Sequence, residues 1–177
     1  YVSGMRLDTV ADINWQIVTT GDFDNNGSND LLWRHQQTGN IYLWHMNGTF
    51  KRSYGPLSDY DSHQWITTVS NDWRIKGSGD LNGDGTHDIL WRNTKDGRNW
   101  AYLMKEGRVE TSKQLNTVSD TQWNIEMVGD FNGDGKSDIF WHHQGTGRTY
   151  IYLMEGTTII KRGHLPTVEN SWQAIDH

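Results

Sequence analysis

The chain has 177 residues, enough for one domain or part of one, with 16 Lys and Arg against 22 Asp and Glu and a formal net charge of −6. This acidic balance and the absence of a basic cluster argue against nucleic acid as a partner, because phosphate contacts need a basic patch. No segment approaches the roughly 20 consecutive apolar residues of a membrane span, and no apolar signal stretch is present.

The composition otherwise favours short strands and tight turns. Ten Trp, nineteen Gly and two Pro are typical of β-structure, and no segment shows sustained helical spacing of apolar residues. Cysteine is absent, which excludes disulfides and thiolate zinc sites. The eight His show no spacing typical of zinc ligands, and the adjacent His142 and His143 would face opposite sides of a strand.

A repeat organises the chain. Trp15, Trp73 and Trp123 open similar segments, and Trp73 and Trp123 lie 50 residues apart. The distance from Trp15 to Trp73 is 58 residues, so the first repeat carries an insertion, which we place within residues 58–70. Self-similarity at such a period indicates a repeat architecture in which each copy is one structural unit.

The two ends of the chain also match the repeat. Residues 6–12 resemble residues 114–120, which close the second repeat, and Trp172 begins a segment that resembles the one at Trp15. We therefore expect a piece of a longer array, the alternative being a complete protein whose copies assemble into a ring. The predicted units are a preceding tail at 1–14, repeats at 15–72, 73–122 and 123–171, and the head of a further repeat at 172–177.

Each repeat is predicted to hold four short antiparallel strands, rich in aromatic and β-branched residues and bounded by Gly or Asn. The expected strands are 15–21, 30–34, 41–46 and 50–54 in the first repeat, 73–79, 88–92, 100–104 and 109–113 in the second, and 123–129, 138–142, 150–154 and 159–162 in the third. Four-stranded units at this period are typical of β-propeller blades, so the predicted fold class is all-β. A stacked β-solenoid is less favoured, since its turns are usually shorter.

A nine-residue acidic loop joins the first two strands of every repeat. Side-chain oxygens fall at loop positions one, three, five and nine, and Gly stands at position six each time. Hard cations take six to eight oxygens, and Gly allows the positive φ that a chain needs to turn around an ion. We expect the backbone carbonyl of position seven to contribute as well, as in EF-hand loops. The predicted ligands are Asp22, Asp24, Asn26, Ser28 and Asp30; Asp80, Asn82, Asp84, Thr86 and Asp88; and Asp130, Asn132, Asp134, Lys136 and Asp138.

The loops are not EF-hands, because position twelve holds a Trp in place of the bidentate Glu. Calcium is favoured over magnesium, which prefers a smaller and mostly hydrated site. A metal-free Asx and Gly turn is the alternative for a single loop, but three copies with the same oxygen positions favour a metal. Three dications would also offset the formal charge of −6. The sequence therefore predicts three Ca²⁺ sites.

The run Gly129 to Asp138 resembles the FG-GAP repeat in its bacterial VCBS-type form. Similar repeats build the propeller of integrin α subunits and of certain sugar-binding fungal lectins, and the resemblance places calcium ligands on the loop Asp and Asn residues named above. Integrin-type repeats continue with a Gly-Ala-Pro-like stretch, whereas this chain has segments such as Leu31-Leu-Trp-Arg34. This difference argues against an integrin-like partner. The Trp-Arg form of the segment is similar to that of secreted bacterial proteins in which such repeats accompany enzymes or adhesive modules.

Binding is the function that these features favour. The repeated Trp residues are expected in the core, whereas Trp44, Trp65 and Trp100 are not shared by all repeats and are candidates for stacking on a sugar, with partial burial as the alternative. No catalytic motif is present, so we expect no enzyme activity. The prediction is a secreted, calcium-stabilised binding or scaffold module for carbohydrate or an extracellular protein. A fragment of a propeller-based polysaccharide-degrading enzyme is the alternative, and copies that associate through unpaired blade faces are a third hypothesis.

Overall fold

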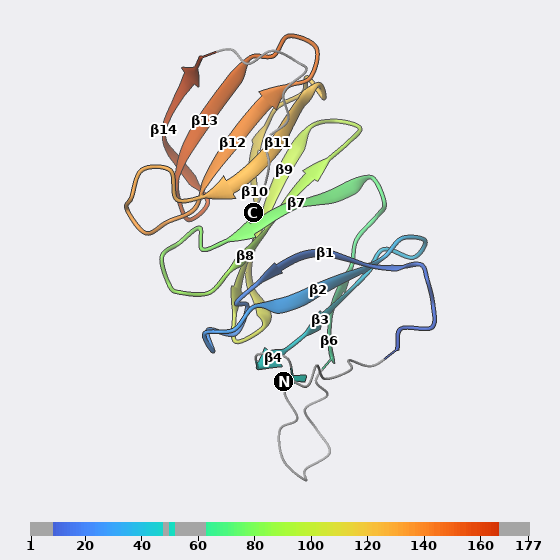
Figure 1. The fold of residues 1–177 in the computed structure, drawn as a ribbon. Helices are drawn as coiled ribbons and strands as arrows, with labels where there is room; N and C mark the ends of the chain where they lie inside the picture. Colours follow the sequence, from blue (N-terminus) through green and yellow to red (C-terminus); the bar gives the residue numbers. More distant parts are fainter. Residues whose placement is uncertain (1–8, 48–49, 52–62, 167–177) are drawn as a thin grey trace, which may run out of the picture.

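The structure of the protein is a computed structural model that describes residues 9–47, 50–51 and 63–166. Over these residues the chain forms strands and turns and no helix, so the predicted all-β class is confirmed. Three four-stranded antiparallel sheets follow one another along the chain, each resembling a propeller blade (Figure 1). In the part of the chain that the structure describes, no helix is long and apolar enough to cross a membrane.

The strands of each blade lie within one predicted repeat. The first blade contains β1 (Trp15–Gly21), β2 (Asp30–His35), β3 (Asn40–Trp44) and β6 (His63–Thr68). The second contains β7 (Trp73–Gly79), β8 (Asp88–Asn93), β9 (Arg98–Lys105) and β10 (Arg108–Thr117). The third contains β11 (Trp123–Gly129), β12 (Asp138–His143), β13 (Thr149–Glu155) and β14 (Thr158–Leu165).

The fourth strand of the first blade differs from the prediction. Phe50–Lys51 forms β5, which pairs with β4 (Met46–Asn47) in a separate two-stranded sheet, so the prediction that this segment begins the fourth strand of the blade is wrong. Residues 52–54 of the predicted strand lie outside the described residues. The fourth strand is β6, which pairs with β3. The insertion thus lies before His63 and not within 63–68. The far end of β6 is anchored where the Val69 N–H donates to the Gly39 carbonyl, as the Val118 N–H does to the Gly97 carbonyl.

The acidic loops occupy the same place in all three sheets. Each first strand pairs with the second up to a Gly and Asp pair at the loop, namely Gly21 with Asp30, Gly79 with Asp88, and Gly129 with Asp138. Each of these strand pairs also carries a register shift three residues into the first strand. Because register is fixed by pairing and by the loop length, the three loops are held in equivalent positions at one end of their blades.

Two hydrophobic cores lie between successive blades. The core between the first and second blades contains Phe23 and Leu32 together with Ile89 and Trp91, and the next contains Leu81 and Leu90 with residues of the third blade. The first strands β1, β7 and β11 contact one another in sequence. Blades that pack face to face around neighbouring first strands are the arrangement expected of a propeller.

The repeated Trp residues of the second strands contribute to these cores. Trp91 and Trp141 are buried. An Arg side chain of the preceding blade lies over each ring, with the guanidinium carbon of Arg34 5.3 Å from the Trp91 centroid and that of Arg92 5.1 Å from the Trp141 centroid. Such cation–π contacts add to the attraction of apolar burial. The expectation that these Trp side chains pack between blades is confirmed for Trp91 and Trp141. Trp33 of the first blade is half-buried, and Trp172 lies outside the described residues.

Candidate metal sites

The first Asp of each loop anchors the turn that follows it. The Asp80 carboxylate accepts hydrogen bonds from the backbone N–H groups of Gly83 at 2.6 Å and Gly85 at 2.8 Å. Asp130 accepts the equivalent bonds in the third loop, and Asp22 accepts two such bonds in the first. These bonds draw the backbone around the carboxylate, because a short acidic side chain can satisfy nearby turn N–H groups.

The last Asp of each loop is buried. Asp30, Asp88 and Asp138 are 0% exposed. In the second loop, one Asp88 oxygen accepts the N–H of Leu81 at 2.9 Å and the other accepts the N–H of Met104 at 2.8 Å. The other two loops repeat both bonds. A carboxylate offers about four lone-pair sites, so two backbone bonds orient it and leave lone pairs for a cation.

The third and fifth positions interact with each other in the second and third loops. The Asn82 amide donates to Asp84 Oδ2 at 2.9 Å, and Asp84 Oδ1 accepts the N–H of Thr86 at 2.8 Å. Asn132 and Asp134 form the same pair at 3.0 Å. The Gly at position six has φ between 82° and 86° in all three loops, a conformation that favours Gly. The contribution of the position-seven carbonyls stays a prediction.

The pKa shifts of the last loop Asp and of the first Asp in the third loop have opposite signs. The pKa of Asp88 is raised to about 7, chiefly by burial and with help from the charges of Asp84 and Asp80, although two backbone hydrogen bonds act to lower it. Burial likewise raises the pKa of Asp138. Backbone hydrogen bonds, led by that from Gly135, lower the pKa of Asp130. The third loop therefore places Asp138, a buried carboxyl with a raised pKa, in the same loop as Asp130, whose pKa is lowered, and a nearby dication would favour the ionised form of both.

Comparison with known proteins agrees with this geometry. Residues 80–141 match the model of the FG-GAP-like repeat. This stretch of the chain is similar to an FG-GAP-type repeat. The match begins at the first Asp of the second loop and ends after the third loop at Trp141, so it contains both loops with the shared Asn and Asp pattern. No curated protein matches the chain.

Successive acidic loops are hydrogen-bonded to each other. The Asp22 carbonyl accepts the N–H of His87 at 2.8 Å, and the Asp80 carbonyl accepts the N–H of Ser137 at 2.6 Å. The Gly before the loop makes this approach possible, because a Cβ at Gly79 would lie 2.9 Å from the Cβ of Ser137. Ordering one loop by a cation would therefore also order its contact with the next blade.

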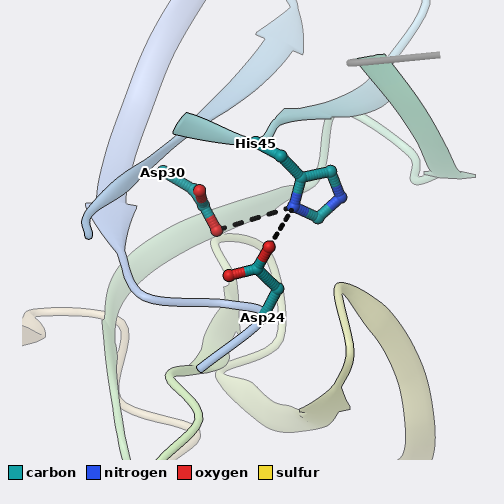
Figure 2. A group of neighbouring side chains, drawn as sticks. All are labelled: Asp24, Asp30 and His45. Atoms are coloured by element: carbon teal, nitrogen blue, oxygen red, sulfur yellow. Dashed lines mark ion pairs between the residues drawn. The ribbon is translucent and has the colours of Figure 1, made fainter. Parts of the chain in front are cut away.

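The first loop differs from the matched pair through a residue that follows β3. His45 Nδ1 lies 3.2 Å from Asp24 Oδ2 and 3.8 Å from Asp30 Oδ2 (Figure 2). The three side chains are 7%, 10% and 0% exposed, respectively. Ligand atoms of all three lie within 4.8 Å of one another, so this loop offers a nitrogen donor together with its oxygens.

Sequence reasoning did not include His45 among the candidate ligands. The signal was present in the repeat alignment, since His45 stands 15 residues after the last loop Asp, where the other repeats have Leu103 and Leu153. Spacing between His residues does not reveal this residue, because its imidazole meets carboxylates that lie 15 and 21 residues earlier in the chain. The β2 and β3 pairing closes that separation.

The three candidate sugar-stacking residues lie in different settings. Trp44 is buried and packs on Trp33 with ring centroids 4.8 Å apart, whereas Trp65 in β6 is 55% exposed. Trp100 is half-buried, and its indole N–H donates to Ser112 Oγ at 2.8 Å. It lines a pocket of about 210 Å³, together with Val69, Trp73, Trp91, Tyr102 and Ser112. The structure thus does not bring these Trp residues into one cluster with the acidic loops.

Two His residues hold turns within the blades. His35 Nε2 lies 2.9 Å from Asp12 Oδ2, and His143 Nε2 lies 3.0 Å from Asp120 Oδ2. The other ring nitrogen of each accepts backbone N–H bonds from the following turn. Equivalent contacts in two blades indicate a structural role for both imidazoles.

Proposed function

We propose that the chain is a calcium-stabilised propeller-type binding or scaffold module that works outside the cell. The observation that carries the proposal is the buried last Asp of each loop, which is held by two backbone N–H groups and has an elevated pKa in the second and third loops. FG-GAP-type repeats are a family in which such loops often bind calcium.

Both side-chain and backbone oxygens of the loops would coordinate Ca²⁺. The first, third, fifth and ninth side chains supply carboxylate and amide oxygens, and the carbonyls of Ser28, Thr86 and Lys136 complete the set. The ion supplies positive charge that offsets carboxylate repulsion. Extracellular modules bind calcium at roughly 10⁻⁴ to 10⁻³ M, which suits a secreted protein in a calcium-rich medium.

Thermal melts with calcium and with a chelator test the metal proposal. Calcium at about 100 times its dissociation constant would stabilise the native state by about 2.7 kcal/mol for each site, so the Tm of the wild type should rise clearly. Asp88→Asn should lose part of that rise. Asp96→Asn is the matched control, since Asp96 is an exposed Asp of the same blade that pairs with Arg98. An equal Tm with calcium and chelator would refute the proposal.

Carbohydrate is the ligand class that we propose first, with an extracellular protein second. The support is the aromatic pocket beside Trp100 and the exposed ring of Trp65, since a broad aromatic face can stack on a sugar ring. A glycan array followed by titration of the best ligand tests this proposal. Trp100→Ala or Trp65→Ala should weaken binding, while Trp44→Phe, at a buried ring, should leave it unchanged. Binding that survives loss of both Trp100 and Trp65 would contradict the assignment.

We propose a role without catalysis. The support is that His35 and His143, which each pair with an Asp outside the acidic loops, both hold turns in the described part of the chain. The assay is incubation of the purified protein with polysaccharides that it binds, followed by measurement of new reducing ends. Depolymerisation by the wild type that is absent from His143→Ala would favour the alternative, a fragment of a polysaccharide-degrading enzyme.

Association of copies is a further proposal about partners. Phe23 and Leu81, which follow the first Asp of their loops, are 0% and 1% exposed because the next blade covers them, whereas Phe131 at the equivalent place is 42% exposed. The third blade thus exposes an apolar residue at a place that is covered in the first two blades. This exposed face can pair with the opposite face of another copy of the chain. Light scattering should show association that Phe131→Asp weakens, and a strict monomer at high concentration would reject it.

A further inference from the structure

The imidazole of His45 is directed into the first loop. His45 lies between β3 and β4, and its Nδ1 faces the Asp24 and Asp30 carboxylates in Figure 2. The residue is 5% exposed. Asp30 is itself oriented by backbone N–H bonds from Phe23 and Met46, so nitrogen and oxygen donors meet at a place that the backbone fixes.

The fold does not require this imidazole. Leu103 and Leu153 stand at the equivalent place in the other two blades, and those blades form the same bond from the following Met N–H to the last loop Asp. The presence of His45 is therefore a property of the first loop alone and not of the blade.

The first loop also differs from the other two in the order of its Asp and Asn residues. The first loop has Asp24 at position three and Asn26 at position five, whereas the other two loops have Asn at position three and Asp at position five. The Asn26 amide is engaged, since it donates to the Met46 carbonyl at 3.2 Å and accepts from the Ser28 N–H at 2.8 Å. In the first loop the carboxylate therefore stands at position three, as Asp24, where it faces His45.

We propose that the first loop is a site for a transition-metal dication of the Zn²⁺ class, with His45 Nδ1, Asp24 and Asp30 as its ligands. This inference rests on the proposed cation sites and refines one of them. In the absence of such a metal the loop can still take calcium, whereas the second and third loops, which offer oxygen only, remain calcium sites.

Ligand chemistry and geometry favour this assignment. Zn²⁺ binds His nitrogen and Asp oxygen at about 2.0–2.2 Å in tetrahedral sites, which places ligand atoms about 3.3 Å apart. The separations from His45 Nδ1 are 3.2 Å to Asp24 and 3.8 Å to Asp30. Imidazole is a good ligand for zinc and its neighbours in the periodic table, whereas calcium prefers oxygen donors. Three protein ligands leave a fourth position for water.

Cobalt titration of the chelator-stripped protein tests the site directly. Co²⁺ is added in the presence of millimolar CaCl₂, and visible absorption reports the coordination. The wild type should bind one equivalent with an intense visible band and release it to Zn²⁺. His45→Leu, which installs the residue found in the other blades, should weaken binding at least about 100-fold, the upper limit for loss of a supporting partner alone. Asp96→Asn should bind as the wild type does.

A reciprocal variant provides a gain of function. Leu103→His combined with Asn82→Asp transfers the two differences to the second loop and should add a second equivalent of Co²⁺ with the same spectrum. If His45→Leu does not fold, His45→Gln takes its place in the same titration.

The inference is overturned if His45→Leu binds Co²⁺ as tightly as the wild type, or if calcium displaces Co²⁺ from the wild type. Three equal calcium sites with no cobalt band would reject this inference and leave the proposed function standing. Cobalt bound through His45 with no calcium bound at the other two loops would reject the calcium proposal instead.

Discussion

The second and third loops have nearly the same sequence and the same internal hydrogen bonds but different neighbours. Asp80 to Asp88 and Asp130 to Asp138 repeat the carboxylate and backbone bonds one for one. The second loop is covered by the third blade, whereas no blade covers the third loop in the described part of the chain. Leu81 is therefore buried, and the equivalent Phe131 is 42% exposed.

The comparison separates what a loop does by itself from what its neighbour adds. Internal hydrogen bonds come from the nine residues and are nearly the same in both loops, the third loop adding a bond from the Asn132 N–H to Asp130 Oδ1 at 3.2 Å. Burial depends on the next blade, which packs on the apolar residue after the first Asp and on the Gly before it. Substitutions at matched positions should therefore have large effects in the second blade and small effects in the third.

The largest difference is expected for the apolar loop residue. Leu81→Ala should destabilise the protein by about 2–5 kcal/mol, because it leaves a cavity between two blades. Phe131→Ala removes a larger side chain but one that is half in solvent, so its cost should be well under half of the usual 3–5 kcal/mol for a buried Phe. Urea unfolding of both variants measures the difference. Equal losses would show that the third face is covered in solution.

A matched pair of Gly substitutions should give a smaller contrast. A Cβ at Gly79 would lie 2.9 Å from the Cβ of Ser137, whereas a Cβ at Gly129 would have no atom within 4 Å. Gly79→Ala should thus cost about 1–3 kcal/mol through overpacking. Gly129→Ala should be neutral or stabilise by up to about 1 kcal/mol, since it restricts the unfolded chain. A destabilised Gly129→Ala protein would contradict the comparison.

The last expected effect is a pH dependence in chelator. Asp88 has a pKa of about 7 when folded against an ordinary value of 3.8, so between these values the folded state holds a proton that the unfolded state has lost. The stability contributed by this group therefore falls as pH rises from about 4 to about 7 and is constant above. Tm measured across that window should fall more for the wild type than for Asp88→Asn. Saturating calcium should remove the difference in slope.

Sequence and structure agree best where the repeat alone decides the conformation. The Asp and Gly positions of the loops and the first three strands of each blade were predictable, because pairing on both sides of a loop of constant length fixes them. The fourth strand of the first blade was not, since an insertion before His63 shifts it away from the preceding turn. Its position follows from contacts with β3, which local sequence does not reveal.

The candidate metal sites also divide into features that the sequence reveals and features that it does not. Oxygen donors within nine residues could be read from the sequence, but His45 reaches them only through the pairing of β2 with β3. Burial of the last Asp likewise depends on the packing of successive blades. The raised pKa of Asp88 is thus a property of the assembled blades that the loop sequence alone does not contain.

A crystal structure of the protein grown in millimolar calcium tests the central claim most directly. The account predicts ion density in the second and third loops, within about 2.3–2.6 Å of oxygens from Asp80 and Asp88 and from Asp130 and Asp138. Well-ordered loops that contain water alone at that calcium concentration would contradict it.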